Sequence, residues 1–153
     1  PWHIDKSYFM VDSEYTASFW MPTVGLTQEQ ALSFAKGSHS ERKLLMPKGF
    51  KFNDSLESED TFLPFTESEV DSNYETVSWD MERGDVAVFN FYTIHSAPSC
   101  ILPYDRKALS LRIVGDHSTF DGRVKNPAPP FTQMGYKGEH GDPIKETWFP
   151  KYK

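Results

Sequence analysis

The 153-residue sequence contains one cysteine, no cluster of basic residues and no long apolar run. The lone cysteine, Cys100, excludes an intrachain disulfide and favours a reducing, cytoplasmic setting. No apolar stretch approaches the roughly 20 residues that span a bilayer, which argues against a membrane partner. The formal net charge is -6. A nucleic-acid partner is not expected, because lysines and arginines nowhere gather among aromatic residues.

Aromatic residues and short β-branched runs dominate the rest of the chain. Aromatic residues make up 15% of the sequence, which favours strands over a helical bundle. Turn residues separate the predicted strands, which cover residues 15–24, 31–35, 75–79, 86–95 and 106–114. Short strands of this kind predict one all-β domain over residues 1–153, with the sandwich or barrel architecture of a jelly roll.

Two segments lack a strand pattern. Residues 51–75 are crowded with acidic and serine residues, which predicts a solvated, irregular acidic loop. A Ca²⁺ loop is not supported there, because the Asp-x-Asp-x-Asp-Gly spacing is missing. Residues 126–153 are rich in proline, glycine and aromatics and predict an extended tail, anchored by Phe131, Trp148 and Phe149.

The first residues bring an imidazole and a carboxylate together. His3 and Asp5 are two positions apart, so on a strand their side chains project from the same face. The candidates for a third metal ligand are His39, His95, His117 and His140. His95 stands out because it closes the predicted strand 86–95, just before a Ser-Ala-Pro loop. Two histidines and one carboxylate form the facial triad of non-haem Fe(II) oxygenases, although either motif alone is more often structural.

The predicted strand 106–114 carries two arginines on one face. That face holds Arg106, Ala108, Ser110 and Arg112, whereas the other holds Lys107, Leu109, Leu111 and Ile113. If the arginine face points inward, it would hold a carboxylate-bearing ligand near the metal, because a guanidinium matches a carboxylate bidentately. The alternative is that this face is exposed and the leucine face forms the core. The pattern leaves both readings open.

Several of these features occur in the order seen in a known enzyme family. The ordered segments are His3-Ile4-Asp5, Trp20, Gly37-Ser38-His39, Gly84-Asp85, His95-Ser96-Ala97, Arg106 to Ser110, and Arg112 to Asp116. In this order the sequence resembles the phytanoyl-CoA dioxygenase-like family of Fe(II)/2-oxoglutarate-dependent oxygenases. The resemblance covers nearly the whole chain.

The resemblance implies a double-stranded β-helix that lacks the helical N-terminal region of the family. It implies that His3, Asp5 and His95 bind Fe(II). It also implies that Arg106 grips the distal carboxylate of the co-substrate 2-oxoglutarate.

Three further matches concern the neighbourhood of that centre. Trp20 matches a family position that lines the co-substrate pocket, and Ser110 matches a family serine in the same region. Arg112 and Asp116 match a recurrent Arg-x-x-Gly-Asp motif, which we interpret as structural, with an internal ion pair.

The activity that the resemblance implies is hydroxylation of a small organic substrate with O₂ and 2-oxoglutarate, releasing succinate and CO₂. Asp5 favours hydroxylation because related halogenases carry a small residue at this position. The alternatives are a cupin-type metal-binding module, an isomerase or lyase with another metal, and an inactive fragment.

Overall fold

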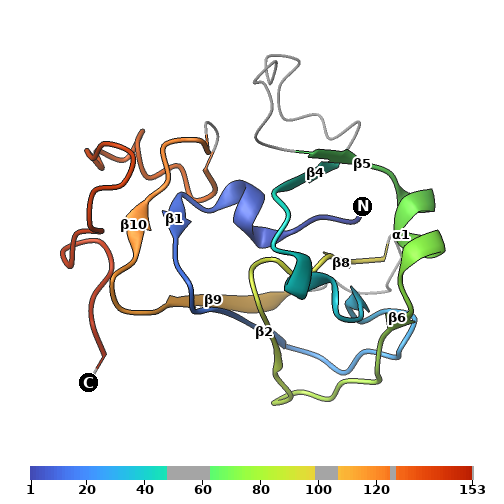
Figure 1. Cartoon of the computed structure of the whole chain (residues 1–153). Helices are drawn as coiled ribbons and strands as arrows, with labels where there is room; N and C mark the ends of the chain where they lie inside the picture. Colours follow the sequence, from blue (N-terminus) through green and yellow to red (C-terminus); the bar gives the residue numbers. More distant parts are fainter. Residues whose placement is uncertain (48–62, 99–106, 125–126, 153) are drawn as a thin grey trace.

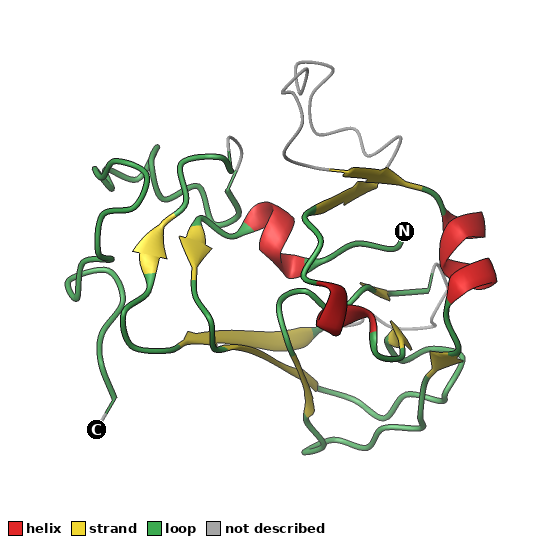
Figure 2. Ribbon diagram, in the orientation of Figure 1, coloured by secondary structure: helices red, strands yellow, loops and turns green. Residues whose placement is uncertain are grey.

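The computed structural model describes residues 1–47, 63–98, 107–124 and 127–152. Its helices are η1 (Asp5–Tyr8), η2 (Ser38–Glu41) and α1 (Glu67–Asn73). Its strands are β1 (Val11–Asp12), β2 (Thr16–Pro22), β3 (Ser33–Ala35), β4 (Leu45–Pro47), β5 (Leu63–Phe65), β6 (Thr76–Val77), β7 (Ala87–Phe89), β8 (His95–Ser96), β9 (Ala108–Val114) and β10 (Thr119–Phe120). Strands outnumber helices, which are few and short (Figure 2), so the prediction of a mainly β chain is confirmed.

Two antiparallel sheets of three strands form the centre of the molecule, in the orders β7-β2-β9 and β6-β3-β8. In the first sheet Ser18 of β2 lies opposite Arg112 of β9. In the second, Phe34 of β3 lies opposite His95 of β8. The ring centroids of Phe34 and Phe89, one from each sheet, are 5.1 Å apart, so the inner surfaces of the two sheets face each other. This is the arrangement predicted for a jelly roll.

The C-terminal tail packs at one end of this pair of sheets. Figure 1 shows the tail beside β1 and β10, with α1 at the opposite end of the molecule. Phe131 and Phe149 pack against Phe9 and its buried neighbours. Trp148 packs against Tyr136. The aromatic anchors predicted for the tail are therefore confirmed.

The predicted strand 86–95 is two strands, β7 and β8, separated by a turn. The side-chain oxygen of Asn90 accepts a hydrogen bond from the backbone of Tyr92, and its carbonyl accepts one from the backbone of Thr93. An asparagine that bonds the backbone two residues ahead closes a turn even within a run of β-forming residues. His95 therefore begins β8, and the prediction that it ends a long strand is wrong.

Part of the segment predicted as an irregular acidic loop is regular. β5 pairs with β4 in parallel, and α1 follows it. The helix begins with a capping box, in which Thr66 and Glu69 exchange side-chain and backbone hydrogen bonds. Acidic residues in the first turn also suit the positive end of the helix dipole. Residues 51–62 of the predicted loop lie outside the described residues.

Strand β9 carries its leucines on the outer surface. Leu109 is 61% exposed and Leu111 is 48% exposed, whereas Arg112 turns inward to the carboxylate of Asp5. At Arg112, therefore, the arginine face of β9 points inward, whereas Ala108 and Ser110 of the same face are exposed. A guanidinium is stable on an inner surface when it meets an opposite charge.

Among the residues that the structure describes, no helix has the length and apolar character that a membrane span requires.

Candidate metal centre

His3 and His95 are joined through their backbones. Each donates its N–H to the carbonyl of the other, and both distances are 2.9 Å. The bridge adds the start of the chain to the edge of the β6-β3-β8 sheet. It also sets the two imidazole rings side by side, with centroids 4.3 Å apart.

Asp5 reaches the same point because Ile4 is extended, with φ -118° and ψ 143°. An extended residue sends its two neighbours to the same side. Ile4 itself points the other way and is fully buried in an apolar cluster with Tyr92 and Ile94. The alternation predicted from the spacing of His3 and Asp5 is thus present, although η1 begins at Asp5 itself.

One ligand atom from each of His3, Asp5 and His95 lies within 4.8 Å of the other two. The remaining histidines lie elsewhere. His39 lies outside the cluster and lines a neighbouring cavity, His117 lies in a turn with a positive φ, and His140 lies beside Asp121. The three residues predicted from the sequence are therefore the ones that the fold brings together.

Hydrogen bonds from Nδ1 orient both imidazoles. Nδ1 of His95 lies 2.9 Å from the carbonyl of Thr93, and Nδ1 of His3 lies 3.1 Å from the carbonyl of Pro1. Because a carbonyl only accepts, Nδ1 is the protonated nitrogen in both rings, and Nε2 keeps its lone pair. Such a partner on the second nitrogen is typical of metal-binding histidines.

The charges of the three residues suit a divalent cation. Burial lowers the pKa of His95 to about 4, and burial also lowers the pKa of His3. Burial would raise the pKa of Asp5, but its hydrogen bond to Arg112 and the charge of Arg112 hold this pKa below its ordinary value. At neutral pH the site therefore offers two neutral imidazoles and a carboxylate, the protonation states that a bound metal requires.

Arg112 binds the Asp5 carboxylate in a two-pronged contact. Its Nη2 donates to Oδ1 at 2.8 Å, and its Nε donates to Oδ2 at 3.2 Å. Ser18 also donates a hydrogen bond to Oδ2. Arg112 forms an internal ion pair, but its partner is Asp5 and not Asp116 of the Arg-x-x-Gly-Asp motif.

The residues predicted to hold a co-substrate are only partly described. Arg106 lies outside the described residues. Trp20 and Ser110 are paired across β2 and β9. Ser110 is exposed, whereas Trp20 packs against a buried cluster that includes Leu26 and Met81. Because Arg106 is not described, its contact with the far carboxylate of 2-oxoglutarate stays a prediction.

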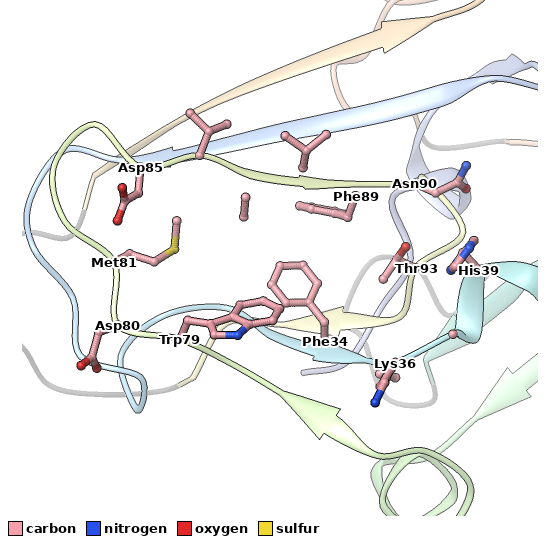
Figure 3. Close-up of a pocket in the computed structure, with 15 residues that line it drawn as sticks. Phe34, Lys36, His39, Trp79, Asp80, Met81, Asp85, Phe89, Asn90 and Thr93 are labelled. Atoms are coloured by element: carbon pink, nitrogen blue, oxygen red, sulfur yellow. The ribbon is translucent and has the colours of Figure 1, made fainter.

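An aromatic cavity of about 660 Å³ lies next to the candidate centre. In Figure 3, Phe34 and Trp79 lie on one side and Phe89 on the other. The ring of His95 touches the cavity wall, with its centroid 4.5 Å from that of Phe89 and 6.1 Å from that of Phe34. Sequence reasoning missed this wall. The alternation of residues 31–35 placed Phe34 on a strand, but its facing partner depends on the packing of two sheets.

The sequence profile of the phytanoyl-CoA dioxygenase (PhyH) family matches residues 1–100 of the chain. No functionally curated protein sequence matches the chain.

Solved structures of larger proteins share the fold. One is the non-haem alpha-ketoglutarate-dependent carbocyclase SnoK from nogalamycin biosynthesis, with a TM-score of 0.66 and 16% identity over 95% of this chain and 52% of that one. Another is the non-haem alpha-ketoglutarate-dependent epimerase SnoN, with a TM-score of 0.63 and 14% identity over 95% of this chain and 51% of that one. SnoN has also been solved with Fe³⁺, alpha-ketoglutarate and a nogalamycin compound. The chain spans about half the length of these structures, and the likeness confirms the predicted jelly-roll fold.

Proposed function

Because the chain belongs to the phytanoyl-CoA dioxygenase family, we propose that it carries the metal centre of an Fe(II)- and 2-oxoglutarate-dependent oxygenase. The observation that carries this proposal is the meeting of the His3, Asp5 and His95 ligand atoms within 4.8 Å. When bound, Fe(II) with 2-oxoglutarate and O₂ supplies the oxidation of a small-molecule substrate, with release of succinate and CO₂.

The protein's own contribution is to hold these three ligands in the correct state. Carbonyl partners on Nδ1 orient the imidazoles of His3 and His95, which frees both Nε2 atoms. Asp5 supplies the negative charge, and its burial excludes water from one side of the site. These features favour an enzyme over a surface that binds metal adventitiously.

We assign the far carboxylate of 2-oxoglutarate to Arg106, with Trp20 and Ser110 beside it. Ser110 and Arg112 have the same parity along β9, where Arg112 turns inward and Ser110 is exposed. Arg106 has this parity in the sequence. The support for these three assignments is this pattern together with the family resemblance.

Hydroxylation is the outcome that we propose for the substrate. The carboxylate of Asp5 is present in the same cluster as the two histidines, which supports hydroxylation over halogenation. SnoN and SnoK are an epimerase and a carbocyclase, so the same fold serves other oxidative outcomes. The aromatic cavity beside His95 supports a substrate with an apolar part.

The test is an anaerobic titration of the purified protein with Fe(II) and then with 2-oxoglutarate. We expect the weak visible charge-transfer band of the Fe(II)–2-oxoglutarate chelate to develop with one equivalent of metal. His95→Ala should abolish the band, and Arg106→Ala should weaken it.

Other outcomes would reject the proposal in distinct ways. Fe(II) binding without a band would indicate a cupin-type metal-binding module. An absorption band of unchanged intensity in His95→Ala would show that the metal binds elsewhere. Absence of binding to well-folded protein would show that this chain is inactive by itself.

A further inference from the structure

We propose that Arg112 and Ser18 act as positioning residues that hold the Asp5 carboxylate so that it presents one oxygen, Oδ1, to the metal. This inference rests on the proposed function, because it concerns the same three-residue centre. It adds two residues that do not touch the metal and that no sequence motif assigned to it.

The register of the β7-β2-β9 sheet places both donors at one point. Ser18 and Arg112 lie directly opposite each other on β2 and β9. Opposed residues on antiparallel strands have Cβ atoms about 4.5–5.5 Å apart, so their side chains can reach one acceptor together. Here that acceptor is Asp5, which enters from a different part of the chain.

The two oxygens of Asp5 have different surroundings. Oδ2 accepts hydrogen bonds from Ser18 and from Nε of Arg112, which use both of its lone pairs. Among the described residues, Oδ1 accepts a hydrogen bond from Nη2 of Arg112 alone, and it lies 4.0 Å from Nε2 of His95. Only Oδ1 therefore keeps a lone pair on the side where the imidazoles meet.

The donors are themselves held firmly. Ser18 is fully buried. The guanidinium of Arg112 lies 6.0 Å from the ring centroid of Phe9, and Phe9 is buried against Phe91. A rigid planar fork fixes the plane of the carboxylate, which a lysine ammonium would not do.

Two effects of Arg112 on metal affinity oppose each other. Its charge repels a divalent cation, whereas its hydrogen bonds hold the ligand in place. Loss of a hydrogen-bonding partner of a metal ligand typically weakens metal binding about 10–100-fold. We therefore expect the positioning effect to prevail.

The experiment uses Co(II) as a visible substitute for Fe(II). The protein is titrated with Co(II), and the absorption spectrum gives both Kd and the ligand environment. Arg112→Met should weaken binding about 10–100-fold and change the band shape. Arg112→Lys, which keeps the charge without the fork, should remain weak, and Ser18→Ala should show a smaller loss of the same kind. Arg83→Met removes a charge from an exposed turn and should leave Kd and spectrum unchanged.

The outcomes distinguish failure of this inference from failure of the proposed function. If wild-type protein binds Co(II) and the Arg112 and Ser18 variants bind it equally well with the same spectrum, the positioning role is wrong and the metal centre stands. Tighter binding by Arg112→Met would also reject it, since Arg112 would then act only as a competing cation. If wild-type protein binds no Co(II), both the positioning role and the proposed metal centre are wrong. Should Arg112→Met fail to fold, Ser18→Ala, a change of one oxygen atom, decides the matter.

Discussion

His3 and His95 exchange backbone hydrogen bonds in both directions. The two imidazoles therefore owe their proximity to a β-bridge and not to side-chain contacts alone. Substitution of either side chain leaves the bridge in place, which allows the ligands to be tested one at a time.

Co(II) should stabilise the folded protein through these ligands. At a free Co(II) concentration of about 100 times Kd, linkage predicts an increase of about 2.7 kcal/mol in the free energy of unfolding. His95→Ala should remove this increase, and chelation should reverse it in wild-type protein. The measurement is chemical denaturation with and without metal. His117→Asn is the matched control, since His117 lies in an exposed turn with positive φ that asparagine tolerates.

Asp5→Ala should abolish 2-oxoglutarate turnover, because the site would lose its one negative charge. The assay is succinate release under air with Fe(II). Turnover by Asp5→Ala at the wild-type rate, without added carboxylate, would show that Asp5 is not a ligand.

Ile4→Ala should destabilise the protein and also loosen the metal centre. Ile4 lies between the two ligands in sequence, and its side chain is fully buried in an apolar cluster, so truncation should lower the free energy of unfolding by about 2–5 kcal/mol. Ile4→Val, the conservative control, should lose only about 0.5–1.5 kcal/mol. Urea denaturation measures both. Equal losses in the two variants would contradict the packing described for this residue.

Asp121 should confer stability that disappears in acid. Burial alone would raise the pKa of Asp121, but hydrogen bonds from Arg123 and Lys6 hold this pKa far below its ordinary value of 3.8. A depressed carboxyl pKa stabilises the fold above the unfolded pKa, and this contribution is lost as the pH falls toward the folded pKa.

The comparison for Asp121 is with Asp121→Asn. At pH 7 the variant should be less stable by about 3–5 kcal/mol, because Lys6 would be left buried without its counter-charge. The difference should be constant above about pH 5 and shrink below pH 4. A difference that is equal at pH 7 and pH 3 would show that the ion pair is not its source.

Thr66→Ala should weaken α1 by about 1 kcal/mol, because the helix would lose its N-terminal cap. Thr66→Ser keeps the capping oxygen and should be nearly neutral. Amide hydrogen exchange in residues 67–73 reports this directly. Unchanged exchange in Thr66→Ala would mean that tertiary packing, not the cap, holds the helix.

Features that depend on local spacing could be predicted from the sequence. The two-residue step between His3 and Asp5 predicted their common direction, and the β-forming runs predicted β2, β3 and β9 within a few residues. The capping box at Thr66 and the turn-forming Asn90 were also local signals. The first lies within an acidic, serine-rich segment and the second within a continuous β pattern, and each of these surroundings predicts a different structure.

Features that depend on long-range pairing could not be predicted. The alternation of β9 was compatible with either face inward, and only the pairing of β9 with β2 brings Arg112 to Asp5. The aromatic wall of Phe34 and Phe89 likewise requires two sheets to face each other. In each case the two partners are far apart in sequence, so the spacing of residues within one strand does not predict their contact.

The opposition of Ser18 and Arg112 makes the centre sensitive to the length of β2. Insertion or deletion of one residue within this strand would turn its side chains to the opposite surface of the sheet. Ser18 would leave the carboxylate even though every proposed metal ligand remained unchanged in sequence. Loops around the sheets can therefore vary in length during evolution, whereas an insertion or deletion inside β2 or β9 would separate Ser18 from Arg112.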